Sequence, residues 1–224
     1  MCWWRWRNVI ERKFIEDKVK EHKVKEWLKK ELIDMGYSHC ELEKTPLGTK
    51  VTIYSFKPGM VVGRGGENIA RISQILEEEF KLESPHIEVK EVEVPELDPV
   101  IMANRIAKQL ANYGVTKFKA IGHRNLQRIM EAGAIGAEII ISGKVPSARA
   151  KSWRFYSGYL PKCGEVAKNE VREGFKAEKL KIGVVGVTVR ILPPGVVMPD
   201  RVEIKEGIGV EEVGDQEDEE GGAS

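Results

Sequence analysis

The stretch Lys57-Pro-Gly-Met-Val-Val-Gly-Arg-Gly-Gly-Glu-Asn68 decides how its surroundings fold. Its proline predicts a short helical turn, because proline suits the first position of a helix. Its glycines then predict a tight turn, and apolar residues at spacings of three and four predict a second helix over about 67–81. Free backbone N–H groups at such a turn, together with the helix dipole, are suited to binding an anion.

Two common phosphate-binding motifs do not fit this turn. The Walker motif needs Gly-Lys-Ser/Thr after four spacer residues, but the fifth residue after Gly59 is Arg64, and no Lys-Ser/Thr pair follows. The dinucleotide fingerprint needs Gly-x-Gly-x-x-Gly after a strand, but Gly63-Arg-Gly65 is followed by Gly66-Glu-Asn68 and the turn follows a helix. The sequence therefore argues against a nucleotide triphosphatase and a dinucleotide-binding enzyme.

The segments around the turn predict a small α+β domain. Apolar residues at helical spacing predict a helix over 11–35, and β-rich runs on both sides of Thr45-Pro-Leu-Gly48 predict a hairpin. A third strand is predicted over 86–94. The order helix, strand, strand, helix, helix, strand resembles the type II K-homology fold. In that fold a Gly-x-x-Gly turn clamps about four nucleotides of single-stranded nucleic acid.

A second α+β domain is predicted after the prolines at 95 and 99. Asp98-Pro99 gives the signals that start a helix, and Gly114 separates it from a second helix. Four strands are then predicted, over about 137–145, 152–160, 167–178 and 182–192. We therefore expect an α+β chain with a type II K-homology domain (α-β-β-α-α-β) over 9–95 and a two-helix, four-strand domain over 96–195.

The two ends of the chain differ from this core. Residues 201–224 hold nine acids and two bases, and the segment has no apolar periodicity, so 196–224 is predicted to be an acidic, disordered tail. Residues 1–8 form an atypical, tryptophan-rich extension. The predicted first domain begins near Val9, so our hypothesis is that translation starts there at a GTG codon. The intact mass of the native protein tests this hypothesis.

Basic charge is concentrated in the second domain. Of 36 bases and 35 acids in the chain, residues 1–200 hold 34 bases and 26 acids, a net charge of +8. Residues 105–162 alone carry eleven bases and two acids. A solvated surface is the simplest interpretation of basic residues, but so few acids over this length favour a polyanionic partner.

Several classes of protein are disfavoured by composition. The three cysteines are far apart and odd in number, which argues against a disulfide framework and for a reducing compartment. No Cys or His pair has zinc spacing, so we expect no metal and no other cofactor. The sequence contains no apolar run of about 18 residues, so no membrane span is predicted. No secretion signal is expected either.

Seven ordered blocks of sequence, spread over 9–195, resemble the universal ribosomal protein three family of the small subunit, in its archaeal form. They are Thr45–Thr49, Lys57–Gly66, His86–Val92, Ile129–Gly136, Ile141–Val145, Ala148–Lys151 and Ile182–Val189. The resemblance implies a structural, non-enzymatic ribosomal protein of the cytoplasm. It implies that the protein binds small-subunit rRNA in the head and lines the channel through which mRNA enters. Its expected partners are that rRNA, mRNA and the head proteins ten and fourteen, and no membrane.

The candidate RNA-binding residues combine the glycine turn with basic positions of the second domain. They are Lys57, Gly63, Arg64, Gly65, Gly66, Lys117, Lys119, His123, Arg124, Arg128, Lys144, Arg149, Lys151 and Arg154. Three positions depart from the family pattern: Gly65 stands where a second basic residue is common, Ala120 replaces the second base after Lys119, and His123 replaces another base. These departures weaken any expectation of mRNA unwinding.

Two other functions stay open. Some eukaryotic relatives are credited with DNA lyase activity, which would need a lysine of lowered pKa, and no lysine has a sequence environment that argues for one. A K-homology regulator that binds RNA outside the ribosome is the second alternative. The aromatic residues Trp153, Phe155, Tyr156 and Tyr159 are candidates for base stacking, although core packing is the simpler interpretation.

Overall fold

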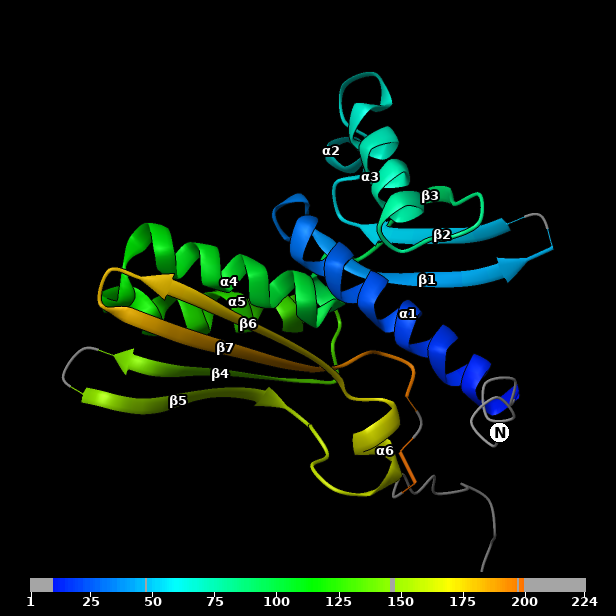
Figure 1. The fold of residues 1–224 in the computed structure, drawn as a ribbon. Coiled ribbons are helices and arrows are strands. Elements are labelled where there is room, and N and C mark those ends of the chain that lie inside the picture. The colour runs from blue at the N-terminus through cyan, green and yellow to red at the C-terminus, as the bar shows by residue number, and fades with distance from the viewer. Residues whose placement is uncertain (1–9, 47, 146–147, 197, 200–224) are drawn as a thin grey trace, which may run out of the picture.

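Two β-sheets organise the chain, and each has its own helices and its own hydrophobic core (Figure 1). The computed structural model describes residues 10–46, 48–145, 148–196 and 198–199. The predictions for residues 1–8 and for nearly all of the acidic tail therefore lie outside the described residues.

The first unit has the predicted order of helices and strands. Its elements are α1 (Ile10–Glu31), β1 (Tyr37–Thr45), β2 (Gly48–Ser55), α2 (Pro58–Val62), α3 (Glu67–Glu78) and β3 (His86–Glu91). Strand β2 lies in the centre of the sheet, antiparallel to β1 and parallel to β3. This is the expected type II K-homology arrangement.

The first core lies between this sheet and the helices α1 and α3. Val24 and Leu28 of α1 are fully buried, and so are Ile72 and Leu76 of α3. Only the C-terminal half of α1 contributes, because the apolar side chains of its first turns, such as Phe14, stay exposed. The spacing of apolar residues predicted this helix but placed its end at residue 35, whereas α1 ends at Glu31 and Ile33–Met35 form a separate 3-10 turn. It also did not distinguish the buried half of the helix from its exposed half.

The second unit has the predicted two helices and four strands, with one more short helix. Its elements are α4 (Pro99–Tyr113), α5 (Phe118–Glu131), β4 (Gly136–Val145), β5 (Ala148–Gly158), α6 (Gly164–Asn169), β6 (Arg172–Leu180) and β7 (Gly183–Leu192). The strand predicted over 167–178 begins too early, because its first residues belong to α6. The run Glu165-Val-Ala-Lys168 consists mostly of good helix formers, which explains the difference.

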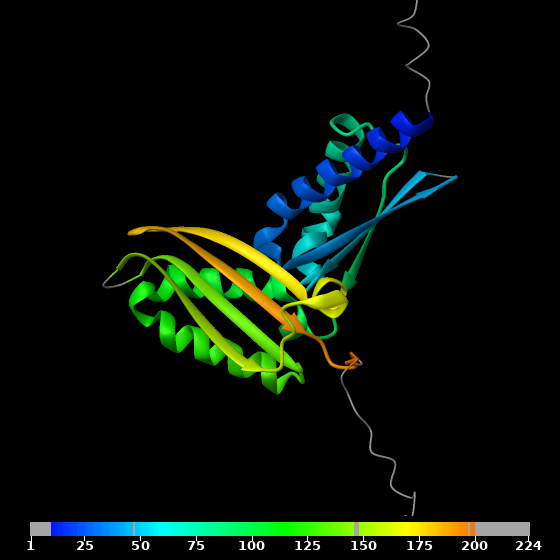
Figure 2. The same ribbon diagram turned by 90° about the horizontal axis from the view of Figure 1, so that it is seen from below.

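The second sheet is covered by helices on one face. The strand order is β5-β4-β7-β6 with all neighbours antiparallel, and α4 and α5 lie along the same face (Figures 1 and 2). Side chains alternate along β4, so Ile139 and Ile141 are buried under the helices while Glu138, Ile140 and Ser142 belong to the other face. In the described part of the chain, this second face has no helix packed on it.

The two units touch where β1 meets the start of α4. The Asp98 carboxylate accepts hydrogen bonds from the backbone N–H groups of Val100 and Ile101 and so caps α4 as predicted. The same carboxylate accepts a hydrogen bond from the Ser38 hydroxyl on β1. Lys108 of α4 forms an ion pair with Asp34, at 2.9 Å between Nζ and Oδ1. The cap of a helix in the second unit is thereby also a contact with the first.

Candidate nucleic-acid interface

The glycine-rich turn joins α2 to α3 at an outer end of the first unit (Figure 1). Gly63, Gly65 and Gly66 have φ angles of +75°, +63° and +83°, and residues other than glycine rarely adopt such angles. The backbone reverses within these four residues, and α3 starts directly behind them. The predicted Gly-x-x-Gly turn is therefore present with the conformation that its glycines require.

The turn exposes backbone rather than side chains. A Cβ atom added at Gly65 or Gly66 would meet no atom within 4 Å, so open space lies beside both residues. At Gly63 an added Cβ would come within 2.8 Å of the Asn68 amide, which itself donates to the Met60 carbonyl at 3.1 Å. Gly66 begins α3 without a side-chain cap. The Glu67 N–H donates to the Arg64 carbonyl, which leaves the next N–H groups in the first turn of α3 as the donors for an anion, and the helix dipole favours an anion there as well.

Cationic and apolar side chains border this turn. Lys57 and Arg64 are exposed, so both predicted cations can reach a ligand at the turn. Phe56 and Met60 are 40% and 49% exposed, which is unusual for large apolar side chains in a folded domain. Sequence reasoning did not select these two residues, although Met60 lies inside the quoted stretch. Met60, whose carbonyl accepts from Asn68, therefore places exposed apolar surface beside the turn.

The basic residues of the second unit gather along α5 and the neighbouring strand β5. Arg124 is exposed and Arg128 half-buried on α5, and the exposed Lys117 belongs to the 3-10 turn directly before this helix. Lys119 and Lys151 both lie over the Trp153 ring, with Nζ 4.9 Å and 4.6 Å from its centroid. We call the seven candidates on this turn, α5 and β5 the α5–β5 face: Lys117, Lys119, His123, Arg124, Arg128, Arg149 and Lys151.

Aromatic rings support this face from beneath. Trp153 is half-buried and packs on Phe118, with ring centroids 5.3 Å apart. Phe155 is buried and meets the exposed His123 edge to face at 5.0 Å. Core packing therefore accounts for Phe155, while Trp153 also holds two lysines in place. Tyr156 and Tyr159 are exposed, so the core-packing interpretation is wrong for them.

Two predicted cations lie on the other face of the sheet. Arg154 alternates with Trp153 and Phe155 along β5, and the exposed Lys144 alternates with the buried Val145 on β4. Both were predicted from sequence to bind RNA together with the other basic residues. Because side chains alternate along a strand, Lys144 and Arg154 lie on the opposite side of the sheet from the α5–β5 face.

Arg154 is held there by a buried carboxylate. Glu138 is only 1% exposed, and its carboxylate accepts hydrogen bonds from Arg154 and, at 3.0 Å, from Lys162 Nζ. Arg190 approaches the second carboxylate oxygen to 3.6 Å and also pairs with Glu173 at 3.3 Å. Sequence reasoning missed Glu138, because only the register of the sheet brings residues 138, 154 and 190 together.

The carboxyl of Glu138 is ionised in this cluster. Burial by itself would raise its pKa, but the hydrogen bonds from Lys162 and Arg154 outweigh burial, and the pKa lies below its usual range. A carboxyl with a lowered folded-state pKa stabilises the fold above its unfolded pKa. That stabilisation is lost as the pH falls through the folded pKa.

Replacement of Glu138 by Gln should therefore destabilise the protein in a pH-dependent way. At pH 7 we expect a loss of about 1–3 kcal/mol of unfolding free energy, because the carboxylate is buried and hydrogen-bonded to charged groups. The difference from the parent should shrink as the pH falls below the unfolded pKa of a glutamate, about 4.3, and on through the lowered folded-state pKa of Glu138. Denaturant unfolding at several pH values measures both effects.

Glu173→Gln serves as the matched control for this prediction. Glu173 pairs with the same Arg190 but its side chain is 51% exposed, so its loss should cost less than about 1 kcal/mol. Equal effects of the two substitutions at pH 7 would contradict the role given to the buried carboxylate.

Two further features of the described residues bear on function. No three His, Cys, Asp or Glu side chains gather there in an arrangement that could hold a metal ion. None of the helices in the described ranges has the length and apolar character needed to cross a membrane.

Comparison with known proteins identifies the family. Residues 23–97 match the model of the KH domain, and residues 106–191 match that of "Ribosomal protein S3, C-terminal domain". The small ribosomal subunit protein uS3 of Methanothermobacter thermautotrophicus is 46% identical over 86% of this chain and 74% of its own length. Its counterpart in Methanocaldococcus jannaschii is 44% identical over 93% of this chain and 100% of its own length. The chain belongs to the uS3 family of small-subunit ribosomal proteins.

The family confirms the coarse predictions made from sequence. The resemblance to the archaeal family, the K-homology domain and the location in the ribosome of the cytoplasm all hold. The uS3 proteins are structural components of the small subunit, a class named for its place in the ribosome and not for an enzymatic reaction. The RNA contacts of individual residues and the domain boundaries stay predictions.

Proposed function

We propose that this protein contacts RNA through two surfaces, the Gly-x-x-Gly turn and the α5–β5 face. In the small-subunit head the turn would hold single-stranded rRNA, and the α5–β5 face would line the channel through which mRNA enters. The observation that carries the proposal is the pairing of exposed backbone at Gly65 and Gly66 with the concentrated cations of α5 and β5. We also propose a domain boundary near residue 95 and contacts with head proteins ten and fourteen.

The turn suits phosphate groups because it offers backbone N–H donors without steric cover. A ribose-phosphate backbone can approach Gly65 and Gly66 closely, since neither carries a side chain and nothing fills the space beside them. Arg64 adds one mobile positive charge at the same place. The exposed apolar surface of Met60 can pack on a base. Backbone contacts of this kind hold a strand with little dependence on sequence.

The α5–β5 face suits a passing strand for a different reason. Its basic residues come from adjacent elements, and three of them, Lys119, His123 and Lys151, lie against aromatic rings. Phosphate contacts position a nucleic acid without reading its bases. A surface that must accept any mRNA sequence needs this property. The missing bases at Ala120 and His123 argue for guidance of mRNA rather than strong unwinding.

The salt dependence of RNA binding tests this proposal. We expect replacement of Lys117, Arg124 and Arg128 by Ala to flatten the slope of log affinity against log salt by about 2, since each neutralised single-strand phosphate contributes about 0.7. Preference among RNA sequences should change little. The measurement is the binding of the full chain to single-stranded RNA at several salt concentrations.

A charge-matched control distinguishes a contact from a general charge effect. Lys13, Lys23 and Lys29 are exposed on α1, where many acids accompany them, and their replacement by Ala removes the same charge. We expect this control to retain the parent slope. If the variant with Lys117, Arg124 and Arg128 replaced by Ala keeps the parent's slope of log affinity against log salt, these three residues face water or protein. The proposed mRNA contact would then be assigned to Lys119, Arg149 and Lys151.

Sedimentation in high salt separates the proposal from its alternatives. A ribosomal constituent should remain with the small subunits, whereas a K-homology regulator that acts outside the ribosome should be released. A DNA lyase would in addition cleave abasic DNA and form a reducible adduct through a lysine amine. Quantitative release from small subunits would contradict the structural role.

A further inference from the structure

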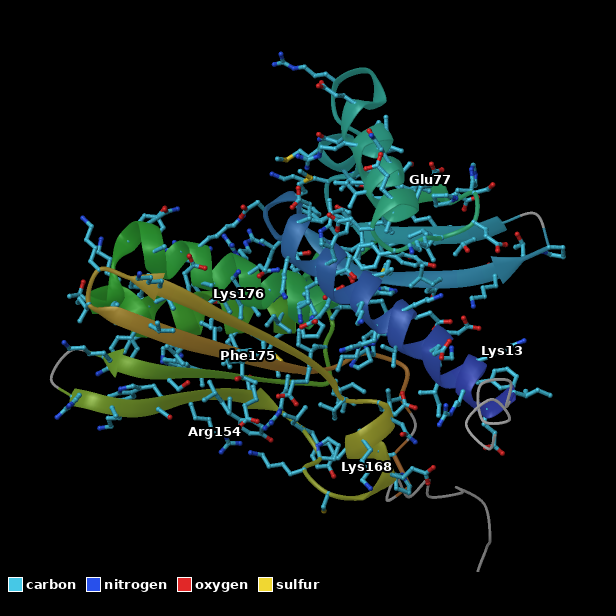
Figure 3. All side chains as sticks on the ribbon, in the orientation of Figure 1. Lys13, Glu77, Arg154, Lys168, Phe175 and Lys176 are labelled. Carbon is cyan, nitrogen blue, oxygen red and sulfur yellow. The ribbon has the colours of Figure 1, made fainter. Side chains whose placement is uncertain are left out.

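The uncovered face of the second sheet carries two exposed aromatic rings. Tyr156 on β5 is 45% exposed and Phe175 on β6 is 56% exposed. Both residues alternate with buried neighbours, Phe155 and Gly174, so their side chains leave the sheet on the side away from α4 and α5. Figure 3 labels Phe175 together with Arg154, the neighbour of Tyr156. The rings stand on the two edge strands, which lie three strand spacings, or about 14 Å, apart across the sheet.

The Phe175 ring packs over a glycine, Gly186, on the neighbouring strand. A Cβ atom added at Gly186 on β7 would come within 3.2 Å of the Ser142 hydroxyl oxygen and 3.3 Å of the Phe175 ring, so the ring lies close over this residue. Glycine beneath an aromatic ring is a recognised way to stabilise a sheet. The arrangement holds the ring against the sheet and leaves more than half of the side chain open to solvent.

Positive charge surrounds the rings. The Arg154 guanidinium lies 4.8 Å from the centroid of Tyr156 and is held there by Glu138. Five cations border this face, against the two acids Glu138 and Glu173, which leaves a net charge of +3. The five are Lys144, Arg154, Lys162, Lys179 and Arg190. Between the two rings the strand register places Glu138 and Arg190, which pair with each other, together with the half-buried Ile140 and the hydroxyl of Thr188.

We propose that this open sheet face is a further binding surface for single-stranded RNA, on which bases stack on Phe175 and Tyr156. The cations around the rings hold the phosphates. Exposed aromatic rings on a four-stranded sheet accept bases of any sequence, because every base has a π-face. The net positive charge favours a nucleic acid over an apolar protein partner. The inference takes its ligand class from the proposed function but uses neither the glycine turn nor the α5–β5 face.

Replacement of Phe175 by Ala tests the stacking contact. In the full chain we expect affinity for a short oligouridylate to fall about tenfold, and Phe175→Leu should fall similarly because leucine keeps apolar bulk but has no ring face. The slope of log affinity against log salt should stay at the parent value, since no phosphate contact is removed. Phe175→Tyr should retain the parent affinity.

Tyr113 provides a matched control. It is an aromatic residue on α4 with a side chain that is 62% exposed, and we expect Tyr113→Ala to bind like the parent. Photo-crosslinking of the same RNA with 4-thiouridine should place crosslinks on β5 and β6. Circular dichroism should show the parent spectrum for each variant, because the substituted side chains are exposed.

Two results would overturn the inference. If Phe175→Ala binds RNA with the parent affinity and crosslinks appear only at the glycine turn and on α5, the inference about the sheet face is refuted. A flattened salt slope in the variant with Lys117, Arg124 and Arg128 replaced by Ala would still support the proposed function in that case. Parent RNA affinity combined with poor incorporation of Phe175→Ala into small subunits would instead assign the face to a protein neighbour.

Discussion

A fragment of residues 9–95 in which Arg64 and Gly65 are both changed to Asp is expected to lose its affinity for single-stranded RNA about hundredfold. The substitutions remove one cation and place two carboxylates where phosphates would lie, and close like charges cost several kcal/mol. Both positions are exposed and a Cβ at Gly65 meets no atom, but the φ of +63° strains any other residue there, so unfolding free energy should fall by about 1–2 kcal/mol. The fragment contains the whole first core, which spans residues 24–89.

Equilibrium binding measures the effect, with circular dichroism as the check on folding. The control changes His22 and Lys23 on α1 to Asp, which alters the net charge equally at two positions away from the turn. We expect this control to lose far less affinity. If the fragment with Arg64→Asp and Gly65→Asp were folded and kept its affinity, the turn would not be the RNA-binding element.

Replacement of Gly174 by Val is expected to unfold the second unit under conditions where the parent is stable. A Cβ atom at this position would lie 2.4 Å from both the carbonyl carbon and the oxygen of Pro99, at the start of α4. These are backbone atoms, so no side chain can move aside. Core overpacking usually costs about 1–3 kcal/mol, and a clash with backbone should exceed about 4 kcal/mol.

Hydrogen exchange followed by residue distinguishes a local from a general effect. Protection should be lost across β4 to β7 and α4, while the first unit, with its separate core, keeps its protection. The matched control is Gly59→Val, because a Cβ at Gly59 meets no atom within 4 Å. Parent-like protection of the second sheet in Gly174→Val would show that α4 can shift away from β6 at little cost.

Much of the candidate site could be predicted because its signals are local. The turn from Gly63 to Gly66 needs positive φ angles that glycine supplies by itself, and Pro58 and Asp98 start their helices through contacts within a few residues. The shared side of Arg124 and Arg128 follows from the helical period, whereas Lys117 lies in the 3-10 turn before α5. Prediction failed where two signals compete over a few residues, as at α6, where a short helix occupies the start of an expected strand.

The family, the order of elements and the positively charged character of the protein are determined by the sequence itself. The tertiary structure alone decides which basic residues share a surface, because strand register places Lys151 on the helix side of β5 and Arg154 on the opposite side with Glu138 and Arg190. It also decides why Gly174 must be glycine. Its φ angle is not positive, and the requirement comes from the backbone of Pro99 at the start of α4, which a Cβ atom would meet at 2.4 Å. Contacts between residues distant in the chain leave no local pattern, so only the packed fold reveals them.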